Sequence, residues 1–218
     1  MKYLFFIAVY KRLEITRKCF ENLKALSSKF DINVFCVCSS VDEAELCNEF
    51  GWDWTIAENF PLGAKFNSGL KEAMNFDFDR LIQIGSDDII TEDLLIKYRE
   101  VDAPYFGIRR AFITNGESAK IWDVYETNKI HSPIGAGRVF TRETLLEVLK
   151  KGDLWPNEIR RGLDGASDTQ MMIRGFRCKL IDFEGIGIIS LKSDVNIWKF
   201  EDMNNCGEVE MKDLEPYL

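Results

Sequence analysis

The chain has 218 residues, of which 46% are hydrophobic and 29% are charged, and its formal net charge is −8. This length and apolar content are typical of one globular domain with a substantial core, and they exclude a disordered chain. An acidic net charge does not favour the wrapping of a polyanion such as DNA, although a local basic patch can still bind one.

The apolar run at the start of the sequence, Leu4 to Val9, is too short for a signal peptide and lacks a small-residue cleavage site. No apolar stretch reaches the about 18 residues of a membrane span. The six cysteines have no paired metal-binding spacing, and we interpret them as reduced thiols. We therefore expect a cytoplasmic protein, in a bacterium or, for a viral source, in the host cell.

The first part of the chain alternates between strand and helix patterns. The expected strands are 3–9, 32–38, 54–57 and 80–84, and the expected helices are 13–28, 41–50, 62–75 and 91–101, the last with Thr91 as its N-cap. This alternation predicts an α/β fold with a mostly parallel sheet and right-handed crossovers. Ligands of such sheets bind beyond the carboxyl ends of the strands.

After Pro104 the pattern changes to short strands mixed with helices. The expected strands are 105–114, 120–125, 138–140 and 178–183, and the expected helices are 141–151 and 164–175. The dipeptide Asn115-Gly116 predicts a hairpin between the first two of these strands. We expect one domain over 1–218, with a doubly wound half, 1–101, a mixed half, 102–218, and a ligand crevice between them.

Two adjacent carboxylates, Asp87 and Asp88, follow the strand 80–84 at its carboxyl end. Hard oxygen ligands at this place suit Mg²⁺ or Mn²⁺, which hold the phosphates of a nucleotide while charge builds on the leaving group. The alternative is a polar turn that only caps the next helix. The position in an α/β sheet favours the metal site.

Four segments, in this order, resemble the GT-A-fold glycosyltransferases, in particular family-2-like members. They are IAVYKRLE (7–14), LGAKFNSGL (62–70), the strand that leads into Ser86-Asp87-Asp88, and IGAGRVFTR (134–142). The resemblance spans about residues 3 to 175. It implies a GT-A fold, with a mostly parallel sheet flanked by helices, and an inverting transfer from a nucleoside diphosphate sugar, such as a UDP-sugar, to a hydroxyl acceptor.

The resemblance also implies which residues bind the donor. The residues beside the nucleoside would come from the segment after the first strand, with Tyr10 against the base. A cation at Lys65 suits a diphosphate, and the alternative is a solvated lysine on an amphipathic helix. The expected donor-binding residues are Ala8, Tyr10, Arg12, Ser39, Asp42, Lys65, Asn67, Asp87 and Lys192.

Two departures from the family pattern affect the metal site. Gly85 stands where the first residue of an Asp-x-Asp motif would be, and Asp87 matches the second. The family's late histidine ligand has no counterpart, because the only histidine, His131, comes too early. In the region where the family has this late histidine, Lys192 could neutralise the diphosphate, or Asp194 could be a metal ligand.

The second half would supply a base and an acceptor surface. A carboxylate takes up the acceptor proton, and Asp164 and Asp168 both match the family's acidic segment, Asp164 with the better spacing to Gly175. The alternative is that Ser167 or Asp168 only starts a helix. The expected acceptor-side residues are Gly135, Gly137, Arg138 and Trp155, the last in a loop expected to be mobile, with Trp122 and Trp198 as other candidates for stacking on a sugar.

Two other functions fit the same architecture. A nucleotidyltransferase would need a glycine-rich loop after the first strand, and residues 10–13 (YKRL) contain no glycine. A non-catalytic module that binds nucleotide sugars is compatible with the missing first Asp and late histidine. The acceptor stays open among a glycan, a lipid-linked sugar, a protein side chain and a modified base in DNA, and the sequence predicts no oligomeric state.

Overall fold

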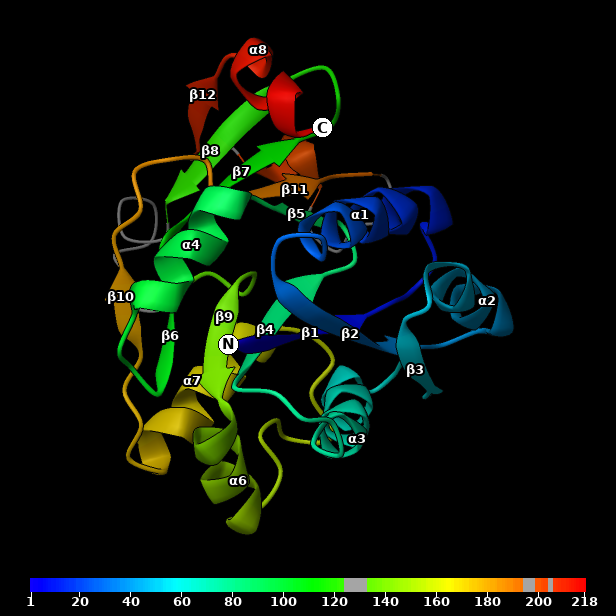
Figure 1. Cartoon of the computed structure of the whole chain (residues 1–218), viewed down its shortest axis with the longest axis vertical. Helices are drawn as coiled ribbons and strands as arrows, with labels where there is room; N and C mark the ends of the chain where they lie inside the picture. Colours follow the sequence, from blue (N-terminus) through cyan, green and yellow to red (C-terminus); the bar gives the residue numbers. More distant parts are fainter. Residues whose placement is uncertain (124–132, 194–198, 204–205) are drawn as a thin grey trace.

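The computed structural model of the chain describes residues 1–123, 133–193, 199–203 and 206–218. Within these residues the strands form a seven-stranded and a five-stranded sheet (Figure 1). The larger sheet contains β1 (Lys2–Ala8), β2 (Asp31–Cys38), β3 (Asp53–Ile56), β4 (Arg80–Gly85), β6 (Tyr105–Ile108), β9 (Arg138–Thr141) and β10 (Lys179–Ile181). The smaller sheet contains β5 (Asp88–Ile90), β7 (Arg110–Thr114), β8 (Ala119–Asp123), β11 (Ile188–Leu191) and β12 (Gly207–Val209).

The larger sheet has the order β10-β6-β9-β4-β1-β2-β3. β1 pairs in parallel with β2 and β4, and β2 pairs in parallel with β3. β9 runs antiparallel between β4 and β6. The mostly parallel central sheet predicted from the sequence is confirmed, with β9 as its antiparallel member. The smaller sheet, in the order β12-β8-β7-β11-β5, mixes parallel and antiparallel pairs.

Helices cover both faces of the larger sheet (Figure 1). The helices α1 (Leu13–Leu26), α2 (Val41–Phe50) and α4 (Glu92–Glu100) lie on one face, and α3 (Leu62–Ala73), α6 (Arg142–Lys150) and α7 (Leu163–Ile173) lie on the other. Buried residues of α1 and α4 also share a cluster with Ile90 and Ile188 of the smaller sheet. Leu214 of the short helix α8 (Met211–Leu214) packs on that sheet. None of the described helices is long and apolar enough to cross a membrane.

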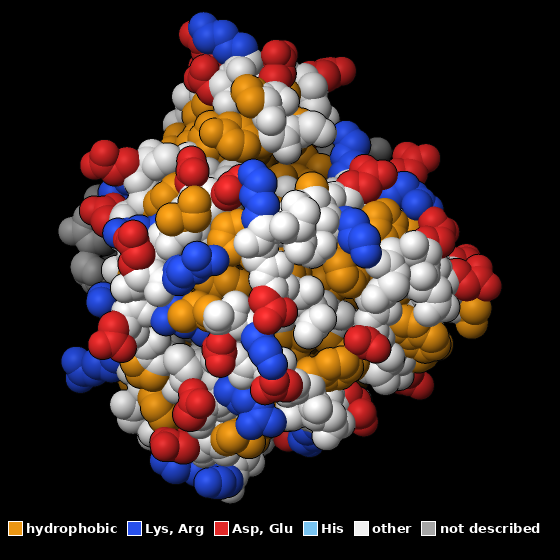
Figure 2. Space-filling model, in the orientation of Figure 1, with side chains coloured by type: hydrophobic (Ala, Val, Ile, Leu, Met, Phe, Trp, Pro, Cys, Tyr) orange, Lys and Arg blue, Asp and Glu red, His pale blue; other side chains and the backbone are white. Residues whose placement is uncertain are grey.

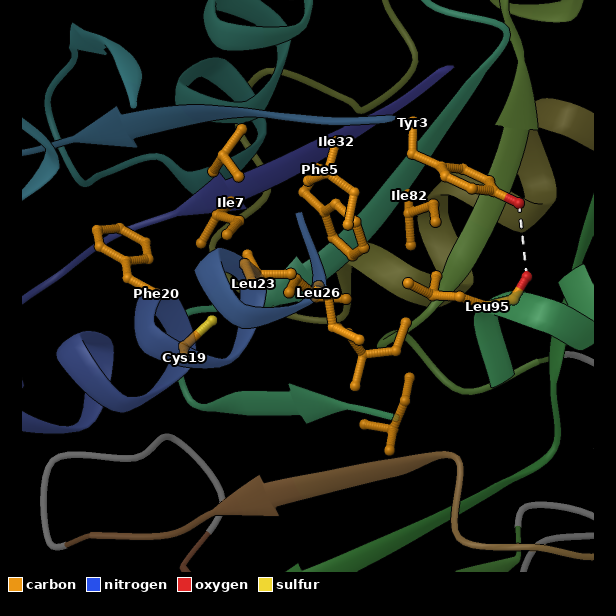
Figure 3. Close-up of a cluster of buried hydrophobic side chains, with 14 of the residues drawn as sticks. Tyr3, Phe5, Ile7, Cys19, Phe20, Leu23, Leu26, Ile32, Ile82 and Leu95 are labelled. Atoms are coloured by element: carbon orange, nitrogen blue, oxygen red, sulfur yellow. Dashed lines mark hydrogen bonds between the residues drawn. The ribbon is translucent and has the colours of Figure 1, made fainter. Parts of the chain in front are cut away.

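The central strand β1 shows why an unbroken apolar run predicts a doubly covered strand. Tyr3, Phe5 and Ile7 belong to the cluster on the α1 face (Figure 3), and Leu4 and Phe6 belong to the cluster on the α3 face. These side chains are all at most 1% exposed. Because successive side chains of a strand face opposite ways, both sets must be apolar when helices cover both faces.

Within the described residues, the predicted elements lie within about two residues of their expected bounds, with one exception, and the last two residues of the expected strand 120–125 are not described. The expected strand 105–114 is wrong, since the chain forms β6 and β7, in different sheets. It leaves the larger sheet at Arg109, whose Nε lies 3.0 Å from the Asp123 carboxylate of β8. Apolar residues flank the pair Arg109-Arg110 on both sides, and the segment contains no glycine, proline or asparagine at the change of sheet to signal a turn.

The two expected halves of the chain interlock. β5, from the first half, pairs with β11 in the smaller sheet, and β9, from the second half, pairs with β4 in the larger sheet. Between β4 and β5 the chain passes from one sheet to the other through Ser86 and Asp87. Asp87 therefore lies where the two sheets meet, at the carboxyl end of β4.

Side chains of both charges are spread over the surface. On the face shown in Figure 2, acidic and basic side chains are interspersed and do not gather into a basic stripe. This distribution agrees with the net charge of −8 and gives this face no electrostatic preference for a polyanion.

Arg138, at the start of β9, holds α7 against the larger sheet. Its side chain is 1% exposed, and its Nη1 lies 2.9 Å from Oδ1 of Asp168 on α7. The guanidinium also donates to the main-chain oxygen of Asp164 at 2.9 Å, and the hydroxyl of Tyr105 donates to Asp168. A buried charge needs its partner, so this ion pair fixes the first turns of α7.

We expect the substitution Asp168→Asn to lower the free energy of unfolding by about 3 kcal/mol, because it leaves the buried Arg138 charge without its carboxylate. Urea denaturation followed by circular dichroism would measure the loss. The matched control is Glu100→Gln, which removes the exposed ion pair with Lys97 and should change stability by less than about 0.5 kcal/mol. Equal urea midpoints for Asp168→Asn and the unmodified protein would contradict the role given to the pair.

Candidate functional site

A cavity of about 680 Å³ opens where β1 and β4 end and the two sheets meet. This volume is in the range of sites for small ligands and cofactors. Its place beyond the carboxyl ends of the parallel strands agrees with the predicted ligand crevice. The cavity is lined by Ala8, Tyr10, Arg12, Asn59, Phe60, Leu62, Lys65, Phe66, Asp87, Ala111, Ile113, Trp122, Ile134, Ala136, Gly162, Leu163, Asp164, Ser190, Lys192 and Met203.

Lys65, on α3, is the buried cation of one wall. It is 1% exposed, and its Nζ donates to the carbonyl oxygen of Val9 at 2.6 Å, to Oγ of Ser39 at 2.7 Å and to Oδ1 of Asn59 at 3.2 Å. Burial lowers the pKa of this ammonium to about 8, although the Glu43 carboxylate favours the proton. Lys65 is thus not a solvated lysine, and it joins the ends of β1 and β2 to the loop before α3.

Glu43, which the sequence did not single out, orders the same loops. It is 2% exposed, and its carboxylate accepts the main-chain N–H groups of Lys11 at 2.6 Å and Ser39 at 2.5 Å. Lys11 and Arg12 both have left-handed backbone conformations, with φ of 57° and 55°. Such conformations are rare for residues other than glycine and persist where the surroundings enforce them. Asp42, one residue earlier, is exposed and does not line the cavity.

Two aromatic rings line the cavity next to Lys65. Tyr10 and Phe60 meet edge to face with centroids 6.4 Å apart, and Nζ of Lys65 lies 5.9 Å from the Tyr10 centroid. Phe60 is 51% exposed, although it precedes a helix that is largely buried. An exposed ring beside a second ring offers a stacking surface for a planar ligand. Its only signal in the sequence is the Phe60-Pro61 dipeptide before α3.

The two carboxylates at the end of β4 have different surroundings. Oδ2 of Asp87 lies 3.2 Å from Nη1 of Arg12 and 3.2 Å from Nζ of Lys192, and all three residues line the cavity. Asp88 accepts the main-chain N–H of Gly85 at 2.6 Å and the hydroxyl of Ser190 at 2.5 Å. Burial, then the Asp87 charge, raises the pKa of Asp88. Asp87 therefore belongs to the cavity, and Asp88 holds the crossing between the sheets.

Asp164 and Asp168 also differ. Asp164 lines the cavity, and among the described residues nothing forms a hydrogen bond or ion pair with its carboxylate oxygens. Burial raises its pKa above the ordinary value, against the effect of the Arg138 charge. The carboxylate of Asp168 forms an ion pair with Arg138. The alternative that Ser167 or Asp168 starts the helix is wrong, because α7 begins at Leu163.

Several expected site residues lie behind the cavity wall. Asn67 donates to the carbonyl oxygen of Trp155 at 2.6 Å and accepts its N–H at 3.0 Å, so the amide holds the loop before α7. Trp155 itself is 2% exposed and packs edge to face on Phe66, which places it in the core rather than on a mobile loop. Gly137, just before β9, does not line the cavity, and an added Cβ there would come 2.4 Å from Ile188.

Gly135 has a direct effect on the cavity. An added Cβ there would lie 2.3 Å from both carboxylate oxygens of Asp164, so only glycine lets the acid occupy its position. The hydroxyl of Ser39 accepts a hydrogen bond from Lys65, and Trp122 also lines the cavity. Asp194, His131 and Trp198, which were also considered from the sequence, lie outside the described residues.

The donor set at Asp87 does not fit a divalent metal ion. In the described part of the chain, no three His, Cys, Asp or Glu side chains come together to hold a metal. Both oxygens of Asp88 are used within the protein, and Asp87 already contacts two cations. A metal ion at Asp87 would lie between two positive side chains, which opposes its binding. The metal expected from the sequence stays a prediction that these contacts argue against.

No protein-family model and no curated protein sequence matches the chain. Among solved structures, residues 1–349 of TarS from S. aureus align with a TM-score of 0.58 at 13% identity, over 88% of this chain and 60% of that one. The inositol-1-phosphate CTP transferase from T. maritima aligns with a TM-score of 0.57 at 15% identity, over 94% of this chain and 92% of that one.

A third similar structure is the CMP:2-keto-3-deoxy-manno-octonic acid synthetase in complex with CTP. It aligns with a TM-score of 0.51 at 14% identity, over 86% of this chain and 92% of that one. The chain thus spans less than two thirds of the TarS fragment and nearly the full length of the other two proteins. At such low identity these likenesses establish the fold alone, and the chain has the GT-A-like fold of nucleotidyl- and glycosyltransferases, as the sequence predicted.

Proposed function

We propose that the chain is a glycosyltransferase that moves a sugar from a nucleoside diphosphate donor to a hydroxyl acceptor, with UDP-sugars as the first donors to test. The proposal rests on the side chains that line a single cavity. This cavity contains a cationic cluster at Asp87 and a carboxylate, Asp164, whose oxygens have no hydrogen-bond or ion-pair partner among the described residues. A transfer from a diphosphate donor needs both groups, one for the leaving group and one for the proton.

The wall formed by β1 and α3 supports nucleotide binding. The rings of Tyr10 and Phe60 offer an apolar surface for a base, and Lys65 and Arg12 add positive charge beside it. Positively charged hydrogen-bond donors, such as an ammonium or a guanidinium, bind phosphate oxygens more strongly than neutral N–H or O–H groups do. A base on the rings would direct its diphosphate toward Arg12 and Asp87.

Asp164 supports the transfer step. The acceptor hydroxyl attacks the anomeric carbon, a new carbon–oxygen bond forms, and the bond to the diphosphate oxygen breaks with its electron pair on the diphosphate. The acceptor proton passes to Asp164, whose raised pKa makes it a better base. Arg138 positions Asp164 by holding its main-chain oxygen, and Gly135 leaves room for its carboxylate.

A ligand screen tests the function directly. Thermal unfolding is measured with nucleoside diphosphates and their sugars, with UDP first, and the donors that bind are then assayed for slow hydrolysis to the nucleoside diphosphate. A ligand at 100 times its dissociation constant should stabilise the fold by about 2.7 kcal/mol. Turnover supports the transferase, whereas binding without any turnover of donor would indicate a non-catalytic nucleotide-sugar module.

Nucleotidyl transfer is the second candidate, favoured by the likeness in fold to a CTP transferase over 94% of this chain. It predicts a different product, because a nucleoside triphosphate and a sugar phosphate would release pyrophosphate. The loop between β1 and α1 supports glycosyl transfer instead, since it contains the left-handed residues Lys11 and Arg12 and no glycine. Pyrophosphate release with a triphosphate, and no turnover of nucleotide sugars, would establish the second candidate.

We expect Asp164→Asn to lower kcat by at least about 100-fold, because the amide cannot accept the proton. The dissociation constant for the nucleoside diphosphate should change little, since Asp164 lies on the acceptor wall. Initial rates with the best donor, together with isothermal titration of the nucleotide, separate the two effects. Glu147→Gln, at an exposed position on α6, is the matched loss of a carboxylate and should leave both values unchanged. An unaltered kcat in Asp164→Asn would remove Asp164 from the mechanism.

We expect nucleoside diphosphate affinity to fall as the pH rises through about 8, because Lys65 then loses its charge. The ionisable groups facing it are Glu43, Cys38 and Tyr10, and Glu43 favours the charged form. Carbon-13 NMR of labelled lysines should show one signal that titrates near 8, well below the ordinary value of about 10.4. The signal should be absent in Lys65→Arg, whose nucleotide affinity should vary less with pH. Titration of every lysine near its ordinary value would contradict the prediction.

A further inference from the structure

We propose that this transferase works without a divalent metal ion, and that Arg12 and Lys192 together bind the diphosphate and stabilise its charge as it leaves. The inference rests on the proposed glycosyl transfer and concerns which groups stabilise the negative charge of the leaving diphosphate, a task that a metal ion would otherwise perform. It reverses the expectation of Mn²⁺ or Mg²⁺ that follows from the two adjacent aspartates.

Asp87 sets the positions of the two cations. Its Oδ2 lies 3.2 Å from both Nη1 of Arg12 and Nζ of Lys192, so one carboxylate oxygen holds a guanidinium and an ammonium on the cavity wall. Hydroxyls support each of them, since Nη2 of Arg12 donates to Ser86 at 3.1 Å and Nζ of Lys192 donates to Ser190 at 3.0 Å. Asp87 acts as the anchor of a cationic site.

Both cations keep donors for a ligand. An ammonium has three N–H groups and a guanidinium has five. Among the described residues, Lys192 uses its donors on Asp87 and Ser190, and Arg12 uses its donors on Asp87 and Ser86. The remaining N–H groups can reach phosphate oxygens, and a guanidinium suits paired phosphate oxygens.

Among the described residues, the positions next to Asp87 offer few oxygens to a metal. The oxygens of Asp88 are bound to the N–H of Gly85 and the hydroxyl of Ser190. An added Cβ at position 85 would lie 2.6 Å from Oδ1 of Asp87 and 2.9 Å from Oδ2 of Asp88, so a further acid there would require these carboxylates to shift. The family's first metal-site aspartate is absent from the sequence, and the observed positions of Asp87 and Asp88 go with glycine at 85.

The charges at Asp87 favour an anion. Arg12 and Lys192 together match the charges of Asp87 and Asp88, but both cations line the cavity, whereas Asp88 is buried and does not line it. A diphosphate in the cavity therefore meets the guanidinium and the ammonium, and a divalent cation would have to lie against them. As the bond between the anomeric carbon and the diphosphate oxygen breaks, the electron pair stays on the diphosphate, and Arg12 and Lys192 are placed to bind the oxygen that becomes more negative.

The test compares nucleotide binding by the full chain in EDTA and in Mn²⁺. Isothermal titration with the nucleoside diphosphate identified in the screen should give the same dissociation constant in both, within about twofold. The transfer or donor hydrolysis rate should likewise survive EDTA. Binding that appears only with Mn²⁺ would overturn the inference while leaving the transferase in place, and no nucleotide binding in either condition would remove the proposed function as well.

A variant identifies the group responsible. Lys192→Met should weaken nucleotide binding at least about tenfold in EDTA, because it removes one of the two charges that meet the diphosphate. The matched control is Lys97→Met on α4, which removes an exposed lysine and should leave binding unchanged. Circular dichroism checks that both variants are folded. Unchanged binding in folded Lys192→Met would overturn the role of Lys192, and the EDTA comparison on the unmodified protein stands independently of any variant.

Discussion

The buried charge of Lys65 is the constraint on which the nucleotide-facing wall of the cavity depends. Its ammonium bonds to Val9, Ser39 and Asn59, which come from three different connections of the chain. Glu43 complements it by accepting the amides of Lys11 and Ser39. A cation that binds oxygens and an anion that binds N–H groups thereby fix the same loops from two sides. Loops that are already held by these bonds leave little ordering for a ligand to provide.

The sequence predicted most of the fold because its strongest signals are local. The unbroken apolar runs of β1 and β2 and the helical stripe of α1 identify a doubly covered parallel sheet, and Asn115-Gly116 identifies the hairpin between β7 and β8. The change of sheet at Arg109 had no local sign. The short strands β5 and β11 were missed for the same reason, since each is stabilised by partners that are distant in the sequence.

The site was predicted in outline, and what was missed depends on packing. The aspartates at the end of β4 were placed by their position after a strand, but only the fold distinguishes Asp87, on the cavity, from Asp88, bound inside the protein. The same holds for Asp164, which faces the cavity, and Asp168, which neutralises a buried arginine. A list of residue types treats each pair as equivalent, because burial and partners are properties of the assembled chain.

The crossing from β4 to β5 has a mechanical consequence. Arg12 follows a strand of the larger sheet, Lys192 follows a strand of the smaller sheet, and Asp87 sits on the segment that joins the two. Any sliding of one sheet over the other alters the separation of the two basic side chains. A ligand bound by both side chains would therefore restrict the motion of the two sheets relative to each other. Conversely, greater mobility between the sheets would weaken the binding of that ligand.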